Sequence, residues 1–156
     1  MKVFSSSQIH KFDSYTIENE PINSIDLMER AAFELFKRIV QLQNSSKPIF
    51  IFSGPGNNGG DGAAISRMLA EVGYNVNFFL LASEKYSPDL LINVERLKKI
   101  GINPISIKSS DDFPNLEGNE VILDSLFGSG LSKPLGGVAE ELVTHINKSP
   151  CEIGRA

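Results

Sequence analysis

An apolar run, a glycine-rich stretch and a helix-forming segment follow one another between residues 49 and 70. Residues 49–52 read Ile-Phe-Ile-Phe, residues 54–62 read Gly-Pro-Gly-Asn-Asn-Gly-Gly-Asp-Gly, and the residues from Ala63 onward favour a helix. Glycines let the backbone turn tightly and approach a ligand closely, and a helix N-terminus presents free N–H groups with partial positive charge. A strand, a glycine loop and a helix in this order are typical of a site that binds nucleotide phosphates.

The rest of the chain alternates between strand-like and helix-like segments, at lengths that suit right-handed crossovers. We expect strands at 49–53, 74–81, 103–107, 120–124 and 151–153. We expect helices before Pro21, from a cap at Ser24, from Ala63 to Gly73, from Ser87 to Gly101, and over 138–146. This order predicts an α/β fold: a Rossmann-like, doubly wound and mainly parallel sheet with N-terminal helices packed on it, in three αβα layers.

The length of 156 residues suits one domain with a sizeable core, and we place that domain over residues 1–153. The last expected strand has barely begun when the chain reaches Gly154, Arg155 and Ala156. Either the chain is cut short, or residues 154–156 are a non-native tail.

The composition excludes several classes of protein. A formal net charge of −4 leaves no basic field that would attract nucleic acid or an anionic membrane. Cys151 is the one cysteine, so a disulfide framework and a multi-cysteine zinc site are excluded, and we interpret it as a core residue. The N-terminus lacks the apolar core of a signal peptide, and no apolar run approaches the ~18 residues that span a bilayer. We therefore expect a cytoplasmic protein.

The first glycine pattern, from Gly54 to Gly59, satisfies G-x-G-x-x-G between an expected strand and an expected helix. A dinucleotide-binding dehydrogenase also places an acid at the end of the second strand, ~20 residues further on. Residues 80–83 contain no acid, and Glu84 comes late, which weakens a dehydrogenase interpretation. The patterns of an α/β-hydrolase elbow and of a P-loop are both absent.

Three polar side chains in the glycine stretch are candidate ligands. A helix N-terminus favours the charge of Asp61, but a bound phosphate would repel it. The carboxylate makes better sense if it accepts a hydrogen bond from a ligand hydroxyl or a loop N–H, or if a cation lies nearby. Asn57 and Asn58 tolerate left-handed backbone and offer amide oxygens, so they are either turn formers or ligands.

A second glycine-rich loop, over 127–137, follows Asp124 at the end of an expected strand. Ligands of open α/β sheets bind at this edge, so Asp124 either faces a ligand or caps the loop. The loop supplies backbone N–H groups, and its Lys133 is either solvated or clamps a phosphate. His10 and His145 have no ligand-spaced partner, and we interpret them as surface or interface residues.

Together these motifs resemble the NAD(P)H-hydrate epimerase family, also called the YjeF N-terminal domain. The resemblance covers nearly the whole chain and rests on Gly54-x-Gly56-Asn57-Asn58-Gly59-Gly60-Asp61-Gly62, Arg67-x-Leu69, the run from Asp124 to Leu131, and Asp26-Leu27-Met28-Glu29-Arg30-Ala31-Ala32. In bacteria this domain is commonly fused to an ADP- or ATP-dependent NAD(P)H-hydrate dehydratase. The resemblance therefore implies the N-terminal part of a bifunctional enzyme.

The resemblance also implies roles for particular residues. The hydrated dinucleotide would contact Asn57, Asn58, Gly59, Gly60 and Asp61, and a second substrate loop would comprise Gly128, Ser129, Gly130, Leu131, Ser132, Lys133 and Pro134. Asn58 and Asp124 would hold a potassium ion. Of the residues present, Asp124 is the best candidate for the catalytic carboxyl, although a potassium ligand stays ionised and makes a poor acid.

The chain departs from the family where an Asp-x-Pro-Ser-Gly segment would follow the fifth strand, because Ile153 is followed by Gly154-Arg155-Ala156. In the family that aspartate contacts the substrate and the serine completes the potassium site. We expect the missing aspartate to be the better group for proton transfer. The chain could therefore keep the fold and part of the site while lacking activity.

The implied reaction interconverts the R and S epimers at C6 of hydrated NADH or NADPH, which is metabolite repair. The alternative from another class is a non-catalytic nucleotide- or protein-binding module of the same fold, as in relatives with interaction roles. Acidic net charge argues against an RNA adaptor. We expect a homo-oligomer, since the amphipathic N-terminal helices could pack on a partner as well as on their own sheet.

Overall fold

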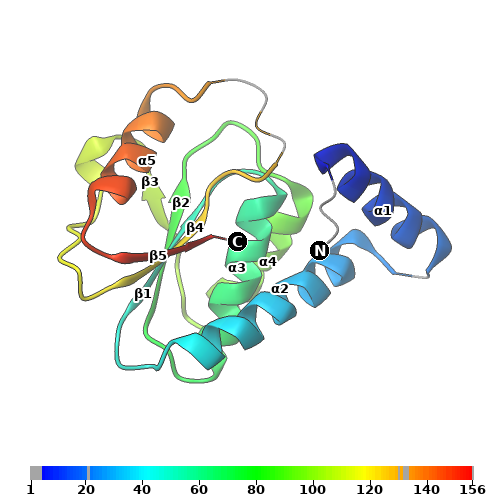
Figure 1. The fold of residues 1–156 in the computed structure, drawn as a ribbon, viewed down its shortest axis with the longest axis horizontal. Coiled ribbons are helices and arrows are strands. Elements are labelled where there is room, and N and C mark those ends of the chain that lie inside the picture. Colours follow the sequence, from blue (N-terminus) through cyan, green and yellow to red (C-terminus); the bar gives the residue numbers. More distant parts are fainter. Residues whose placement is uncertain (1–4, 21, 130, 132–133, 156) are drawn as a thin grey trace.

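A parallel sheet of five strands forms the centre of the computed structural model, which describes residues 5–20, 22–129, 131 and 134–155 (Figure 1). The strands are β1 (Ile49–Ser53), β2 (Val76–Leu81), β3 (Ile105–Ile107), β4 (Val121–Ser125) and β5 (Glu152–Arg155). They lie in the order β3-β2-β1-β4-β5, and every neighbouring pair is parallel. The expected Rossmann-like, doubly wound sheet is confirmed.

Helices cover both faces of the sheet, which completes three layers (Figure 1). They are α1 (Ser6–Asn19), α2 (Ser24–Leu42), α3 (Asn57–Glu71), α4 (Pro88–Lys99) and α5 (Val138–Lys148), with a short 3-10 turn η1 (Ser110–Asp112). On one face α3 packs on β1, β2 and β4, and α2 and α4 flank α3. On the opposite face α5 lies beside η1. The helices that precede β4 in the chain cover one face, and α5, which follows β4, covers the other.

The core is divided by the sheet into two clusters because successive strand residues point to opposite faces. Ile49 and Ile51 of β1 pack under α3, whereas Phe52 packs with Phe79 and with Leu142 of α5. Burial on both faces explains the continuous apolar run of β1, which is the pattern of a central parallel strand.

Helix α3 begins at Asn57, with Gly56 as its N-cap, rather than at the expected Ala63. The loop after β1 is therefore short, and most of the glycine stretch is helical. Glycine is a poor helix former, so local propensity alone predicts a loop. Tertiary packing reverses this: a side chain at Gly59 would place a Cβ 1.9 Å from the carbonyl oxygen of Gly54, so only glycine fits where the helix meets the strand ends.

Other element ends differ from expectation by a few residues, and η1 was not expected. The N-cap of α2 is Asn23 rather than Ser24, while Ser87 caps α4 as expected, its hydroxyl accepting from the N–H of Leu90 at 3.3 Å. Strand β5 runs beyond Ile153, and its Arg155 is paired in register with Asp124. The end of β5 depends on its pairing with β4, which adds strand residues irrespective of local sequence.

The two N-terminal helices behave differently. Helix α2 packs on α3, and its Ile39 joins the core over the sheet, whereas α1 packs on α2 and projects away from the sheet (Figure 1). Tyr15 of α1 is 66% exposed. The expectation that the N-terminal helices pack on the sheet therefore holds for α2, whereas α1 contacts α2 and not the sheet.

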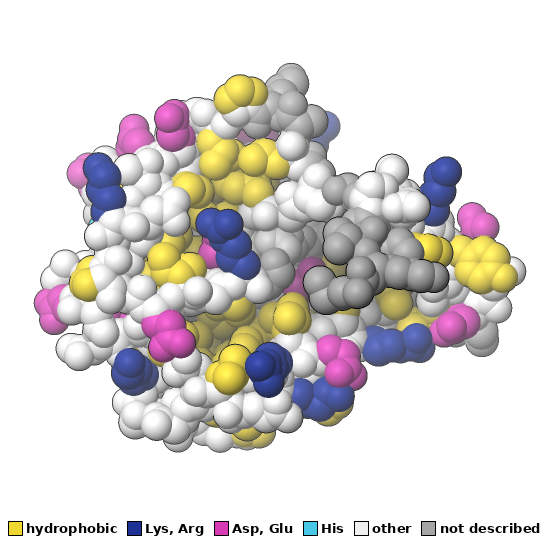
Figure 2. Space-filling model, viewed as in Figure 1, with side chains coloured by type: hydrophobic (Ala, Val, Ile, Leu, Met, Phe, Trp, Pro, Cys, Tyr) yellow, Lys and Arg dark blue, Asp and Glu magenta, His cyan; other side chains and the backbone are white. Residues whose placement is uncertain are grey.

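An apolar hollow of about 240 Å³ lies between the end of α2 and the edge strand β5. Its walls include Leu42 of α2, Leu123 of β4 and Ile153 of β5. Figure 2 shows hydrophobic side chains gathered in this part of the surface. Within the described part of the chain, none of the helices combines the length and the hydropathy needed to cross a membrane.

Candidate functional site at the carboxyl ends of β1 and β4

The chain leaves β1 and β4 in opposite directions, and this divergence creates the candidate site. The two strands are neighbours, with Phe52 opposite Asp124 and Ser53 opposite Ser125. From β1 the chain enters α3 and continues towards β2, whereas from β4 it enters the loop that leads to α5 on the other face. Such a topological switch point is where open α/β sheets bind their ligands.

Close backbone packing seats the start of α3 directly on the strand ends. A Cβ at Gly54 would lie 1.8 Å from the carbonyl oxygen of Leu126, and one at Gly62 would lie 2.5 Å from the hydroxyl of Ser53. The first helical hydrogen bond of α3 runs from the N–H of Gly60 to the carbonyl of Gly56 at 3.2 Å. The preceding N–H groups have no acceptor within the helix, so they and the helix dipole offer an anion site at the switch point.

Asn58 joins the two glycine-rich segments. A Cβ at Gly128 would lie 3.5 Å from the Cβ of Asn58 and 3.6 Å from its Oδ1. The Nδ2 atom of Asn58 is buried and has no hydrogen-bond partner among the described residues. Leaving a buried donor unsatisfied costs about 1–3 kcal/mol, which is the signature of a position that a ligand or water completes.

Asp124 acts as a cap and as half of an ion pair. Its Oδ1 accepts from the N–H of Leu126 at 3.1 Å, and its Oδ2 accepts from Nε of Arg155 at 3.0 Å. The capping role is one of the two alternatives that the sequence left open, whereas the Arg155 partner was not expected.

A potassium ion at Asp124 would compete with Arg155 for the carboxylate. It would lie beside the Arg155 guanidinium, and two positive charges at that separation repel. Among the residues described in the structure, no group of three or more His, Cys, Asp or Glu side chains could hold a metal ion.

Asp61 lies in the first turns of α3 with a half-buried side chain. Burial, together with the negative charge of Asp13 on α1, raises the pKa of Asp61 from 3.8 to about 7. No hydrogen bond or ion pair to Asp61 is formed by another described side chain. The carboxyl therefore changes its charge near neutral pH, which the sequence did not indicate.

The remaining expected site residues fall into three groups: exposed residues, buried glycines, and residues that the structure does not describe. Asn57, Gly128 and Ser129 are exposed near the start of α3 and the end of β4, and Leu131 and Pro134 are exposed in the second loop. Gly60 instead points towards α2 and α4, because a Cβ there would lie 2.7 Å from Met28. Gly59 is buried. Gly130, Ser132 and Lys133 lie outside the described residues.

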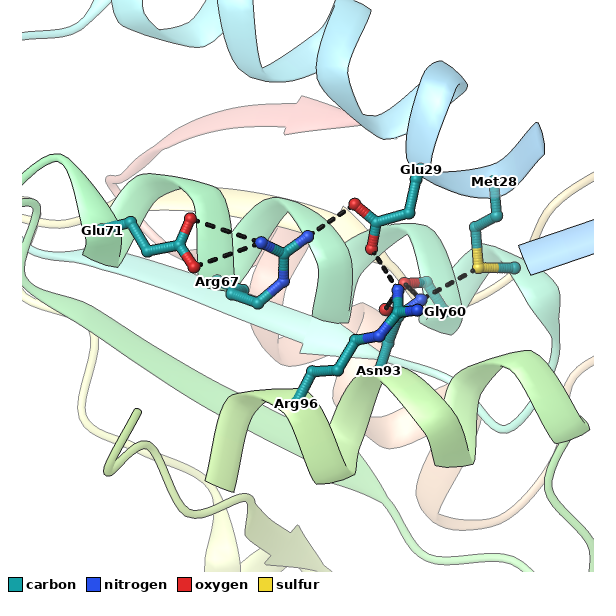
Figure 3. A network of polar contacts seen from close by, with 7 residues as sticks. All are labelled: Met28, Glu29, Gly60, Arg67, Glu71, Asn93 and Arg96. Atoms are coloured by element: carbon teal, nitrogen blue, oxygen red, sulfur yellow. Dashed lines mark hydrogen bonds and ion pairs between the residues drawn. The ribbon is translucent and has the colours of Figure 1, made fainter. Parts of the chain in front are cut away.

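A polar network holds α2 against α3 and α4 and thereby fixes the start of α3 (Figure 3). The carboxylate of Glu29 accepts from Arg67 at 2.5 Å and from Arg96 at 2.7 Å. Asn93 donates to the carbonyl of Gly60 at 3.4 Å and approaches the sulfur of Met28 at 3.3 Å. Sequence reasoning missed these roles, although Glu29 and Arg67 both belong to the segments that carry the family resemblance.

Residues set aside at the sequence level lie away from the switch point. Nε2 of His145 is 2.9 Å from the carbonyl of Pro114, and the ring packs on Phe113. Cys151 packs on the core cluster under α5, as expected for a core residue. The side chain of His10 lies outside the described residues.

Comparison with known proteins gives a consistent result. The family described as "YjeF-related protein N-terminus" matches residues 24–154. The chain is 36% identical to the NAD(P)H-hydrate epimerase of Oenococcus oeni, covering 96% of this chain and 70% of that protein. It is 34% identical to the epimerase of Anaerococcus prevotii, with the same coverage of both chains.

Two further relatives extend the comparison. The bifunctional NAD(P)H-hydrate repair enzyme Nnr of Thermofilum pendens is 34% identical over 96% of this chain, which spans 29% of that enzyme. The crystal structure of yeast ynu0 shares the fold, with a TM-score of 0.83 and 23% identity over 98% of this chain and 69% of the yeast chain. With the family pattern at the switch point and these matches along almost its whole length, the chain belongs to the YjeF-related N-terminal family, that of the NAD(P)H-hydrate epimerases.

Proposed function

We propose that this protein interconverts the R and S epimers at C6 of hydrated NADH and NADPH. The observation that carries the proposal is the meeting of Asn58 and Gly128 at the β1/β4 switch point, directly beside the free N–H groups of α3. That place suits the pyrophosphate of a dinucleotide. The epimerase relatives named above supply the chemistry of the substrate.

The reaction requires little more than positioning and proton transfer. In the hydrate, water has added across C5 and C6 of the nicotinamide ring, so C6 carries a hydroxyl next to N1. The N1 lone pair expels that hydroxyl once an acid protonates it, leaving water and a planar iminium. Water then adds to the opposite face and returns a proton, which inverts C6. A site that holds the pyrophosphate and supplies one carboxyl can perform this reaction.

The residues divide this work between them. The first N–H groups of α3 hold phosphate oxygens, and the exposed loop at Gly128 and Ser129 supplies further backbone N–H groups. The unpartnered amide nitrogen of Asn58 donates to the bound substrate, which removes the cost of a buried and unsatisfied donor. Lys133 as a phosphate clamp remains a prediction.

The potassium ion remains a prediction as well, carried by the family resemblance alone. Arg155 already neutralises Asp124, so the proton-transfer chemistry above needs no ion at that position. A partner domain with dehydratase activity is also a prediction, supported by the bifunctional name of the Thermofilum pendens relative. The same applies to homo-oligomerisation and to a cytoplasmic location.

Epimerisation can be tested directly. Purified S epimer of hydrated NADH is incubated with the protein, and the ratio of C6 epimers is followed by chromatography against the spontaneous rate. We expect the protein to accelerate the approach to equilibrium. Asn58→Leu, which keeps the side-chain volume but removes the amide, should weaken substrate binding, whereas the exposed Glu34→Gln serves as the matched control.

The alternative function is a non-catalytic binding module. It predicts that the protein binds the hydrate in equilibrium dialysis but leaves the epimer ratio at its spontaneous rate. Absence of both binding and acceleration would refute the assignment of the switch point as the substrate site.

A further inference from the structure

We propose that Arg155 binds a phosphate group of the hydrated dinucleotide, beside the loop that follows β4. The proposal rests on the proposed function and deepens it, because it assigns to the substrate's pyrophosphate a cation that the sequence did not indicate. Arg155 is the last residue of β5, and the pairing of β5 with β4 brings it close to the β1/β4 switch point.

The first argument is the place of Arg155 in the sheet. It lies in register with Asp124, at the carboxyl end of two parallel strands. Its side chain leans from the edge strand towards β4, since its Nε donates to Oδ2 of Asp124 at 3.0 Å. The other oxygen of Asp124 accepts from the N–H of Leu126, two residues before Gly128. One carboxylate therefore holds Arg155 at the start of the loop that carries Gly128 and Ser129.

The second argument is the guanidinium itself. Asp124 takes only the Nε donor, and the described residues offer no acceptor to the two terminal nitrogens of Arg155. The arginine side chain is 69% exposed and that of Asp124 is 16% exposed, so the guanidinium is the solvent-facing member of the pair. Its terminal N–H groups form a planar fork that matches two oxygens of a phosphate. Because one end of the group is anchored and the other is open, it is preorganised to bind such an anion.

The third argument is the charge at the strand ends. The pyrophosphate of the substrate is negative, so the carboxylate of Asp124 alone would repel a phosphate that binds there. The ion pair with Arg155 cancels this charge without using the terminal N–H groups of the arginine. Asp124 therefore serves as the anchor of a phosphate-binding arginine, and the local repulsion is removed.

The fourth argument is the side of the sheet on which Arg155 lies. Leu123 packs in the core cluster under α3, whereas Ile122 packs in the cluster under α5. Because side chains alternate along a strand, Asp124 and its neighbour Arg155 face the α5 side, towards which the loop after β4 runs. The start of α3 and Arg155 therefore lie on different sides of the strand ends. We assign the N–H groups of α3 to one phosphate, and Arg155 with the loop N–H groups to the other.

The first test measures binding apart from turnover, with ADP as the probe, because ADP carries a pyrophosphate but no nicotinamide ring. Calorimetry compares the parent with Arg155→Gln, Arg155→Lys and Lys108→Gln. Lys108 is the matched control, since it directly follows β3, the opposite edge strand, at the same end of the sheet. We expect Arg155→Gln to weaken ADP binding about tenfold or more, as is typical when hydrogen bonds to a charged group are lost. Arg155→Lys should recover only part, because one ammonium group does not replace the fork.

The second test measures epimerisation of hydrated NADH by the same variants, in choline chloride without potassium. Arg155→Gln should raise KM about tenfold and leave kcat within about twofold, because binding is lost while the reacting carbon is untouched. Lys108→Gln should match the parent in both constants. Urea unfolding of each variant shows whether the fold is kept.

The outcomes separate this proposal from the proposed function. Unchanged KM in Arg155→Gln, or equal losses of ADP affinity in Arg155→Gln and Lys108→Gln, overturns the role of Arg155 and leaves the epimerase function intact. Where Arg155→Gln does not fold, Arg155→Lys decides, and full affinity in that variant overturns the proposal. A parent that neither binds nor converts the hydrate refutes the proposed function, and the proposal with it.

Discussion

Replacing Glu29 by Gln removes a carboxylate that links α2 to both α3 and α4. Glu29 accepts from Arg67 and Arg96, and the side chains of these three residues are 24%, 18% and 35% exposed. These three side chains are neither fully buried nor fully solvated. The loss in free energy of unfolding should therefore lie between the ~0–1 kcal/mol of a surface ion pair and the ~3–5 kcal/mol of a broken buried pair. Arg67 keeps Glu71 as a partner, which limits the loss.

We therefore expect Glu29→Gln to lower the free energy of unfolding by about 2 kcal/mol. Glu34→Gln is the matched control, because Glu34 forms a salt bridge with Lys37 on the exposed surface of the same helix. That change should cost at most ~0.5 kcal/mol. The assay is urea unfolding followed by circular dichroism, with both variants at the same ionic strength.

A double-mutant cycle with Arg67→Gln isolates the pair itself. We expect Glu29 and Arg67 to be coupled by ~1 kcal/mol or more, since they are in contact and partly shielded from water. Equal costs for Glu29→Gln and Glu34→Gln, or additive effects of the two network variants, would refute the view that this network holds α2 in place.

Further predictions concern the glycine stretch, the titration of Asp61 and the ion pair at the strand ends. Gly62→Ala should cost ~2 kcal/mol or more by urea unfolding, because the new methyl would lie 2.5 Å from a buried serine hydroxyl, whereas Gly56→Ala, with no neighbour within 4 Å, should cost less than ~1 kcal/mol. Asp61 has a higher pKa in the folded protein than in the unfolded chain, so the folded state binds more protons between pH 4 and pH 7 and stability falls as pH rises through this range. Asp61→Asn should abolish that fall in the urea midpoints measured at pH 5 and pH 8, and an unchanged difference would show that other groups cause it. Arg155→Gln frees one oxygen of Asp124, so potassium chloride should stimulate epimerisation of this variant more than that of the parent, with choline chloride as the ionic-strength control.

Much of the fold follows from local sequence. The apolar run of β1 requires burial on both faces, and the Ser87-Pro88 cap starts α4 where expected. The alternation of strands and helices then leaves a doubly wound parallel sheet as the simplest arrangement. These features depend on neighbouring residues and on the period of the apolar pattern, and both are visible in a single sequence.

Part of the site was also predictable. The glycine pattern after a buried strand predicts an anion site at a helix start, and the family resemblance singles out Asn58 and Asp124. The proximity of Asn58 and Gly128 brings the two glycine-rich segments together, which the sequence alone did not show. The ion pair of Asp124 with Arg155 was not visible, because Arg155 reaches Asp124 only through the pairing of β5 with β4.

The sequence by itself determined the class of fold, the position of the glycine-rich motif at a strand end, and the family. Only the tertiary structure decided that α3 begins at Asn57. The glycines of its first turns are required because backbone atoms of the neighbouring loop and strand ends leave no room for a side chain, and local helix propensity does not reveal this. It alone decided that Asp61 holds its proton near neutral pH, since that depends on burial and on Asp13 of another helix. Helix propensity and apolar periodicity are local properties, whereas close packing and the electrostatics of a carboxyl depend on groups that come together only when the chain folds.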